Sequence, residues 1–362
     1  MRHPHDAYDA GDEHDLHHHG DRDLGDGLVD LAVNVRLTTP PAWLRDVLVD
    51  SLSGLGAYPD DTAAVAAIAA RHGVDPACVL PTAGGAEAFT LVARGLGVRR
   101  PVVVHPQFTE PEAALRAAGH RPLRHVLVQD DGFAFTTGTF ERNHRDSDLV
   151  VVGNPTNPTG VLHEAGALRS LTRPGRTLVV DEAFMDAVPG EPETLLTPGA
   201  SLQGLLVVRS LTKTWGLAGL RAGYVVGDPE LVASLRAVQP PWAVSGPALA
   251  ATVACLSDEA VAEADRGARQ LDARRAVLVT ELARLGIRPA APSVAPFVLL
   301  DTSAAGAHSR RKALANLGFA VRRGETFPGL LPAHLRVAVR DENTSRRFVS
   351  ALHSTLGSHR AA

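Results

Sequence analysis

Short apolar runs alternate with helical stretches between residues 60 and 240. Four of them, at residues 101–104, 149–152, 178–180 and 205–208, consist almost wholly of valine and leucine. An uninterrupted run of this kind is typical of a strand buried on both faces. Because helical stretches separate the runs, the chain is predicted to form an α/β fold, with a mostly parallel sheet inside a three-layer α/β/α domain.

The C-terminal third has a different pattern. A long helical stretch from about 247 to 285 precedes two predicted strands, at residues 296–301 and 335–340. A proline-rich break at residues 237–247 is expected to bridge the two parts near the functional site. These elements predict a second, smaller α+β domain.

Composition limits the classes of function. The chain has 362 residues, of which 45% are hydrophobic, and this length suits two domains. A formal net charge of −4 favours neither a nucleic-acid surface nor a membrane surface, and no stretch could span a bilayer. Cys78 and Cys255 are too few for a disulfide framework or a cysteine metal site. Without the apolar core of a signal peptide, a cytoplasmic protein is expected.

The first 27 residues form a separate segment with almost nothing to bury. It is predicted to be a disordered tail rich in histidine and aspartate. Its imidazoles lack the spacing that a folded metal site imposes, so no metal site is assigned, although binding of a divalent ion is an open alternative. The histidines are His3, His5, His14, His17, His18 and His19.

The stretch Ser210-Leu-Thr-Lys213 is followed eight residues later by Arg221. It supplies a hydroxyl, an amine and a guanidinium, which together could hold a phosphorylated aldehyde covalently. A lysine becomes a nucleophile only when part of it is deprotonated, and a nearby positive charge helps by lowering its pKa. Because Ser-x-x-Lys also occurs in acyl-transfer enzymes and on helix surfaces, the neighbouring motifs decide.

Three further motifs precede this stretch. The apolar run 178–180 ends at Asp181, whose carboxylate could keep a pyridine nitrogen protonated. An earlier run leads into a turn rich in proline and asparagine, where Asn157 offers an amide to a phenolic oxygen. Gly85 and Ala86 lie at a predicted helix start, whose backbone N–H groups could bind a phosphate.

In this order the four motifs resemble the fold-type-I pyridoxal-phosphate enzymes of the class I/II aminotransferase family. The resemblance spans most of the chain. It includes Tyr58, similar to the family's tyrosine that reaches the cofactor phosphate from the neighbouring subunit. Phe108 resembles the ring that stacks on the pyridine, and Arg336 the arginine for the substrate α-carboxylate. The resemblance implies a pyridoxal 5'-phosphate cofactor, a small amino-acid substrate and a homodimer with a shared active site.

The resemblance also implies a role for each motif. Lys213 would carry the cofactor and move protons at the substrate α-carbon, and Asp181 would keep the pyridine nitrogen protonated. Asn157 would bond the phenolic oxygen. The cofactor phosphate would be held by Gly85, Ala86, Ser210 and Arg221, with Tyr58 from the partner subunit.

Within this family the N-terminal strand joins the small domain. The expected division of the chain is therefore a disordered tail over residues 1–27, a segment over 28–55 that joins the small domain, a cofactor-binding large domain over 56–240, and a C-terminal small domain over 241–362.

Two subfamilies resemble the chain most, the histidinol-phosphate aminotransferases and the threonine-phosphate decarboxylases of cobalamin biosynthesis. Phe184 stands where the aminotransferases commonly have tyrosine, and residues 321–330 and 335–340 resemble the decarboxylases' C-terminal segment. These features favour decarboxylation of L-threonine O-3-phosphate to aminopropanol phosphate. An aminotransferase that uses 2-oxoglutarate is the alternative, and a non-catalytic pyridoxal-phosphate-binding protein is a remote one.

The substrate and phosphate contacts depart from the family's pattern in two places. Gly84-Gly85-Ala86 replaces the commoner Gly-Asn-Gly run. Asn34 is followed by Val and Arg36, where relatives usually have an Asn-Pro pair. Arg36 is therefore a candidate substrate ligand beside Asn34 and Arg336. Arg322 or Arg323 could meet a substrate phosphate, or both could lie on the surface.

Overall fold

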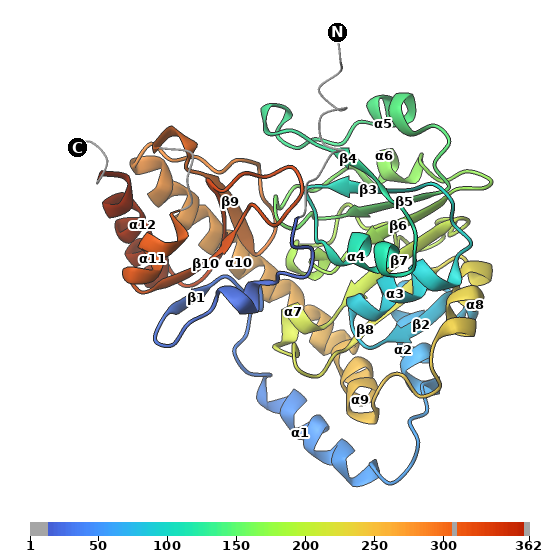
Figure 1. Ribbon diagram of the computed structural model, residues 1–362. Helices are drawn as coiled ribbons and strands as arrows, with labels where there is room; N and C mark the ends of the chain where they lie inside the picture. Colours follow the sequence, from blue (N-terminus) through green and yellow to red (C-terminus); the bar gives the residue numbers. More distant parts are fainter. Residues whose placement is uncertain (1–13, 306–309, 358–362) are drawn as a thin grey trace.

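A computed structural model describes residues 14–305 and 310–357, and Figure 1 shows two sheets within them. The described part of the chain contains a seven-stranded sheet in which one strand, β8, runs antiparallel to its neighbours. This confirms the predicted α/β fold with a mostly parallel sheet. In spatial order the strands are β2 (Val79–Thr82), β8 (Gly223–Gly227), β7 (Leu205–Ser210), β6 (Thr177–Asp181), β5 (Leu149–Gly153), β3 (Pro101–His105) and β4 (Leu123–Val126).

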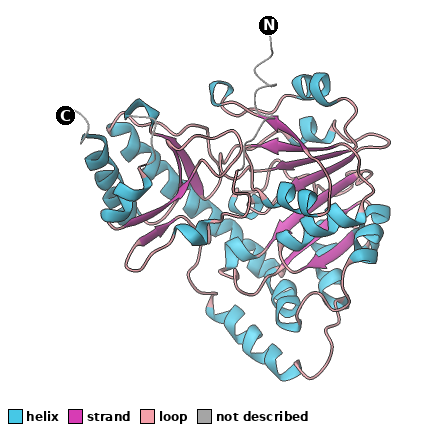
Figure 2. Cartoon of the chain, viewed as in Figure 1, coloured by secondary structure: helices cyan, strands magenta, loops and turns pink. Residues whose placement is uncertain are grey.

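Side chains that alternate along these strands enter two separate cores. Val150 and Val152 of β5 face one core, and Val151 between them faces the other. The second core is covered by α3 (Gly85–Gly95), α4 (Glu110–Ala117) and α8 (Pro229–Val238), which lie in front of the sheet in Figures 1 and 2. The first is covered by α1 (Ala42–Ser51), α2 (Thr62–His72), α5 (Thr137–His144), α6 (Ala165–Arg169) and α9 (Gly246–Cys255).

A four-stranded sheet forms the smaller unit, again counting the described residues. Its strand order is β1 (Val29–Leu31), β10 (Phe319–Arg323), β11 (His334–Ala338) and β9 (Phe297–Asp301). Strand β1 pairs in parallel with β10, so a segment near the N-terminus completes a sheet built from the C-terminal part. This sheet packs with α10 (Asp258–Arg284), α11 (Arg311–Asn316) and α12 (Glu342–Gly357) around a core of its own.

The long helical stretch expected from 247 to 285 is two helices. The chain breaks at Ser257, whose hydroxyl accepts from the Ala260 N–H at 3.2 Å and begins α10. Helix α9 before the break packs on α1 and α2 and shares the core of the large sheet. The residues of α9 thus lie with the large sheet, although the sequence division assigned everything after residue 240 to the small domain.

Residues 14–27 also differ from the expectation of a disordered tail. Leu16 and His18 are buried, and Asp23 is buried against arginines of β10. The expectation rested on polar composition, but a buried carboxylate becomes favourable when cations from elsewhere in the chain pair with it. Residues 1–13, with the first two histidines of the segment, lie outside the described residues. No described helix is long and apolar enough to cross a membrane.

Truncation of a central strand tests this core. Leu206→Ala in β7 removes a fully buried side chain and is expected to lower stability by about 2–5 kcal/mol. The measurement is the thermal midpoint of cofactor-free protein at matched concentration. The control is Leu123→Ala on the edge strand β4, where the side chain is 51% exposed and the change should stay within about 0.5 kcal/mol. Equal losses would contradict the assignment of the core.

Candidate active site

Lys213 lies on the short helix α7 (Thr212–Trp215), which begins two residues after β7 ends. Burial, followed by the positive charges of Arg336 and Arg221, lowers the pKa of Lys213 to about 8, while the Asp181 carboxylate acts in the opposite direction. With that pKa roughly a tenth of the amine is unprotonated at pH 7. The side chain is thus prepared to act as a nucleophile.

Asp181 ends β6, beside the end of β7. Because β5, β6 and β7 are parallel, their carboxyl ends meet at one edge of the sheet, the usual place for a ligand in such folds. The backbone N–H of Ala183 donates to Asp181 Oδ1 at 3.0 Å. Burial raises the pKa of Asp181 to about 6, although this N–H and Lys213 partly offset the effect. The carboxylate therefore gains from a cationic partner.

Arg336 reaches the same site from β11 of the small sheet. Its Nη1 donates to Asn157 Oδ1 at 2.6 Å, and its Nη2 donates to the carbonyl of Ala32. With the Asn34 amide turned so that its oxygen faces the guanidinium, that oxygen accepts from Nη1 at 3.0 Å. The predicted residues Asn34, Asn157 and Arg336 are thus brought together across the two units.

A candidate anion site lies between β2 and α3. Gly84 has φ of 78°, and a Cβ placed on it would lie 2.6 Å from Arg221 Nη2. Arg221 itself adopts a left-handed backbone with φ of 61°, a strained conformation that is common at functional sites. Its guanidinium therefore lies against the start of α3, where the backbone N–H groups of Gly85 and Ala86 have no partner within the helix.

Ser210 lies between this candidate anion site and Lys213. It is the last residue of β7, and its register partner is Gly223 of β8. Its hydroxyl is 2.7 Å from the hydroxyl of Thr212. Both hydroxyls are short and rotatable, so they can donate to an anion without a change in the backbone.

The two predicted aromatic contacts lie in different surroundings. Phe108 is partly buried, with its ring centroid 6.4 Å from that of Phe89 and 5.6 Å from that of His19. Tyr58 is 76% exposed and stacks on Trp242 with ring centroids 4.2 Å apart. A contact of Tyr58 with the cofactor of a partner subunit stays a prediction.

Arg36 lines a pocket together with Asn34, Lys213 and Phe184. Its Nε donates to the Thr214 carbonyl at 3.1 Å. Its guanidinium is packed against Gly267 of α10 and lies 5.8 Å from the centroid of the Trp215 ring, so a contact with substrate stays a prediction.

Arg322 and Arg323 are both held by Asp23. Arg322 Nη1 lies 3.3 Å from one carboxylate oxygen, and Arg323 Nε lies 3.0 Å from the other. Arg322 is also buried, with its guanidinium 4.7 Å from the centroid of the Phe327 ring. In this arrangement Arg322 is internal and Arg323 is partly exposed, and a contact of either with a substrate phosphate stays a prediction.

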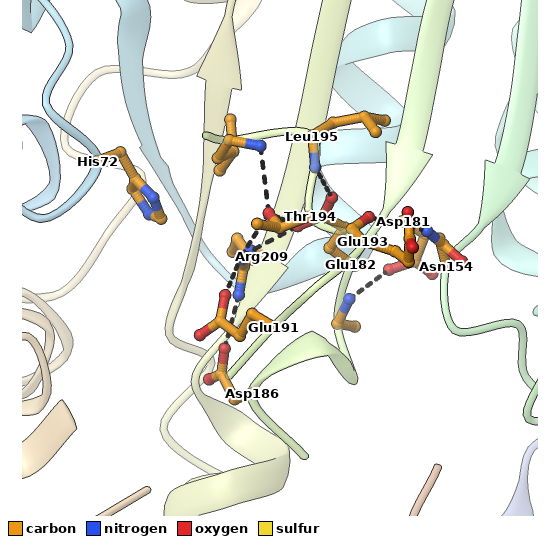
Figure 3. A network of polar contacts seen from close by, with 12 residues as sticks. His72, Asn154, Asp181, Glu182, Asp186, Glu191, Glu193, Thr194, Leu195 and Arg209 are labelled. Carbon is orange, nitrogen blue, oxygen red and sulfur yellow. Dashed lines mark hydrogen bonds and ion pairs between the residues drawn. The ribbon is translucent and has the colours of Figure 1, made fainter. Parts of the chain in front are cut away.

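A buried ionic network behind the site was missed from the sequence (Figure 3). Arg209 donates to Asp186 at 2.7 Å and to Glu191 at 2.6 Å, and it lies 3.0 Å from Glu182. Glu182 follows Asp181 directly and also accepts from the Leu195 N–H at 2.7 Å. A signal was present, because an arginine at a buried strand position requires carboxylate partners.

Comparisons with known proteins agree with this geometry. A sequence model of the class I and II aminotransferases matches residues 26–352. A histidinol-phosphate aminotransferase of Mycobacterium tuberculosis is 47% identical over 328 residues, covering 90% of this chain and 87% of the relative. The chain belongs to the class I and II aminotransferase family. It is therefore a pyridoxal-phosphate-dependent enzyme, as the sequence resemblance indicated.

Other members of the family are similar over nearly the whole chain. Threonine-phosphate decarboxylase of Salmonella typhimurium is 31% identical over 345 residues, covering 91% of this chain and 92% of that protein. The crystal structure of L-threonine-O-3-phosphate decarboxylase from Porphyromonas gingivalis superposes with a TM-score of 0.77 at 27% identity, covering 91% and 99% of the two chains. Both subfamilies named from the sequence are thus represented among the similar proteins.

The lowered pKa predicts how cofactor uptake depends on pH. The chain has only two lysines, Lys213 and Lys312. The rate of pyridoxal-phosphate uptake by cofactor-free protein, followed by visible absorbance, should rise with pH to half its maximum near 8 as Lys213 loses its proton. The control Lys312→Arg should leave the profile unchanged. A midpoint near 10.4, the value of an ordinary lysine, would contradict the assigned environment.

Asp181→Asn is expected to affect activity and stability in opposite directions. Loss of the negative charge that keeps the pyridine nitrogen protonated should lower turnover by about 10²–10⁴-fold, while the cofactor still binds Lys213. The pKa of Asp181 is raised to about 6 in the folded state, so its carboxyl group lowers the stability of the folded protein as pH rises from about 4 through 6. Cofactor-free Asp181→Asn should therefore unfold at a higher temperature than wild type at pH 7.5, but not at pH 4. Unchanged turnover would refute the role.

Proposed function

We propose that this enzyme is an aminotransferase of the histidinol-phosphate kind, which transfers an amino group between an amino-acid phosphate and 2-oxoglutarate. The supporting observation is the 47% identity to a histidinol-phosphate aminotransferase over 90% of the chain. This identity exceeds the 31% to the Salmonella decarboxylase. It favours the reaction that ranked second from the sequence over the decarboxylation that ranked first.

We further propose that the residues at the sheet edge hold the cofactor. The Asp181 carboxylate, which accepts the backbone N–H of Ala183, suits a protonated pyridine nitrogen. The start of α3 and Arg221 suit a phosphate, because Gly84 leaves room for the guanidinium beside free N–H groups. Lys213 supplies the amine for the cofactor aldehyde. The pocket therefore fits pyridoxal phosphate in charge and in donor type.

Each residue then has a defined action in the reaction. Bound pyridoxal phosphate supplies an electron sink for the pair left at the substrate α-carbon. Lys213 would remove the proton from that carbon and later return a proton to complete the amino transfer, since its lowered pKa lets it act as base and acid near neutral pH. Arg336 binds the substrate carboxylate through its planar pair of donors. Asn34 and Asn157 fix the orientation of that guanidinium.

Phosphothreonine decarboxylation is the second candidate, favoured by Phe184. This side chain packs edge-on against Phe297 with centroids 5.1 Å apart, and the Arg336 guanidinium lies 5.3 Å from the same Phe297 ring. Phe184 thus braces the carboxylate-binding arginine and offers no hydroxyl to the cofactor, where the aminotransferases commonly have a tyrosine. The two reactions differ in which bond at the α-carbon is broken.

A homodimer in the cytoplasm completes the proposal. Tyr58 and Trp242 form an exposed aromatic stack, and Leu52 and Leu55 nearby in the chain are also exposed. An exposed apolar group of this kind is typical of a protein interface. A second copy placed there would bring Tyr58 to the phosphate of the neighbouring site, as in the family.

Offering both substrates to the purified enzyme separates the two reactions. With L-histidinol phosphate and 2-oxoglutarate, glutamate should form and no carbon dioxide should be released. With L-threonine O-3-phosphate alone, carbon dioxide should stay at the level of the Lys213→Ala control. Carbon dioxide release without a keto acid would overturn the aminotransferase assignment in favour of the decarboxylase. Cofactor binding without either reaction would favour a non-catalytic protein.

A further inference from the structure

The short helix that carries Lys213 is closed at its end by Arg36. The backbone N–H of Arg36 donates to the Lys213 carbonyl at 2.9 Å, and its side-chain Nε donates to the Thr214 carbonyl at 3.1 Å. The last carbonyls of a helix have no partner within it, and an arginine at that end can supply one. A Cβ on Gly216, which follows α7, would lie 2.9 Å from the Leu37 carbonyl oxygen. The backbone after Arg36 therefore also lies against the end of the helix.

The guanidinium of Arg36 reaches from α7 to the middle of α10. A Cβ placed on Gly267 would lie 2.7 Å from Arg36 Cζ and would overlap Nη1. Gly267 is buried in the interior of a 27-residue helix, where glycine is less favourable than alanine. Its backbone is helical, so conformation alone does not require a glycine. The missing side chain leaves the space that the guanidinium occupies.

Helix α10 contributes to the cores of both units. Ala260 near its start belongs to the core that the large sheet shares with α9, and Leu271 and Leu278 belong to the core of the small sheet. Gly267 lies between these contacts along the helix, which runs from beside α9 to the small sheet in Figure 1. Arg36 therefore joins the helix of Lys213 to the helix that spans the two units.

Aromatic and acidic side chains surround Arg36 from other directions. Its guanidinium lies 5.8 Å from the centroid of the buried Trp215 ring. Burial lowers the pKa of Arg36, and the carboxylates of Glu263 and Asp186 partly offset this effect. Beyond burial, the largest charge effects on the pKa of Lys213 come from Arg336, Arg221, Asp181 and Asp21. Arg36 thus contacts the backbone beside Lys213, whereas other charged groups act on the amine.

We propose that Arg36 is a positioning residue for Lys213 and that Gly267 is the position in α10 that accommodates it. Arg36 closes the last turn of α7 and ties that turn to α10, which keeps the Lys213 side chain buried. It therefore acts on the lysine before any substrate is bound, whereas a substrate ligand would act only afterwards. The inference rests on the proposed role of Lys213 in binding the cofactor.

Cofactor uptake in the absence of substrate tests this role. In Arg36→Met, and in Gly267→Ala, which displaces the guanidinium but keeps its charge, α7 should loosen and expose Lys213 to water. The half-maximal pH of pyridoxal-phosphate uptake by cofactor-free protein should then rise from near 8 by about half a unit or more. Arg36→Lys should behave like Arg36→Met, because a flexible ammonium does not replace the planar guanidinium. The double variant Arg36→Met/Gly267→Ala should shift no further than Arg36→Met.

Two control variants change a similar group elsewhere. Arg274→Met removes an exposed cation of α10 whose charge also lowers the pKa of Arg36. Gly166→Ala adds a methyl group in α6, where it would meet nothing within 4 Å. Both should keep the wild-type midpoint. An unchanged midpoint in Arg36→Met together with a higher KM would make Arg36 a substrate ligand and overturn the proposal. A wild-type midpoint in Arg36→Lys would mean that charge alone matters, and would also overturn it.

Hydrogen exchange of the full-length protein as purified shows whether α7 itself is loosened. In Arg36→Met the amides of residues 212–217 should exchange at least about tenfold faster, while those of β6 and β7 keep their rates. Equal acceleration in β6 and β7 would mean general destabilisation and contradict a positioning role. If Arg36→Met does not fold, Gly267→Ala decides by the same two measurements. Failure of the wild type to take up pyridoxal phosphate would contradict the proposed function, but the exchange result would still decide whether Arg36 holds α7.

Discussion

The active site depends on the burial of Lys213 at the carboxyl edge of the large sheet. A lysine in water is almost fully protonated at neutral pH, but desolvation and two guanidinium groups lower its pKa to about 8. The same burial raises the pKa of Asp181 to about 6. Without a ligand the desolvation of both groups lowers the free energy of unfolding, so the reactive site reduces the stability of the folded protein. A cofactor whose aldehyde reacts with Lys213 and whose basic nitrogen pairs with Asp181 would satisfy both groups.

The surrounding structure keeps these groups in place. Arg209 and Ser210 are consecutive in β7, so their side chains point to opposite faces of the sheet. Arg209 gathers three carboxylates on the far face and fixes the loop after β6 (Figure 3). Each of these charges has a charged or backbone partner, which is the condition for keeping ions in a protein interior. The network therefore holds the backbone around Asp181 and Ser210 from the far face, and its Asp186 also lines the pocket of Asn34, Arg36 and Lys213.

The local sequence was sufficient to predict the large sheet and the residues that lie at its carboxyl edge. Apolar runs mark buried strands, and parallel strands place their following residues together, so the positions of Asp181 and Lys213 follow from pattern alone. The contacts of Asp23 could not be predicted in this way. Its partners Arg322 and Arg323 lie about 300 residues later in the chain, and a polar segment carries no periodic signal for such a pairing. Composition alone therefore classified residues 14–24 as tail, although tertiary contacts fold them onto the site.

The most direct measurement uses the scarcity of lysine in this chain. Borohydride reduction fixes pyridoxal phosphate to whichever lysine has bound its aldehyde, and peptide mass mapping then identifies that lysine. With only Lys213 and Lys312 present, the account predicts the pyridoxyl group on Lys213, near one per subunit, and none after Lys213→Ala. A label on Lys312, or visible cofactor absorbance that survives in Lys213→Ala, would contradict it.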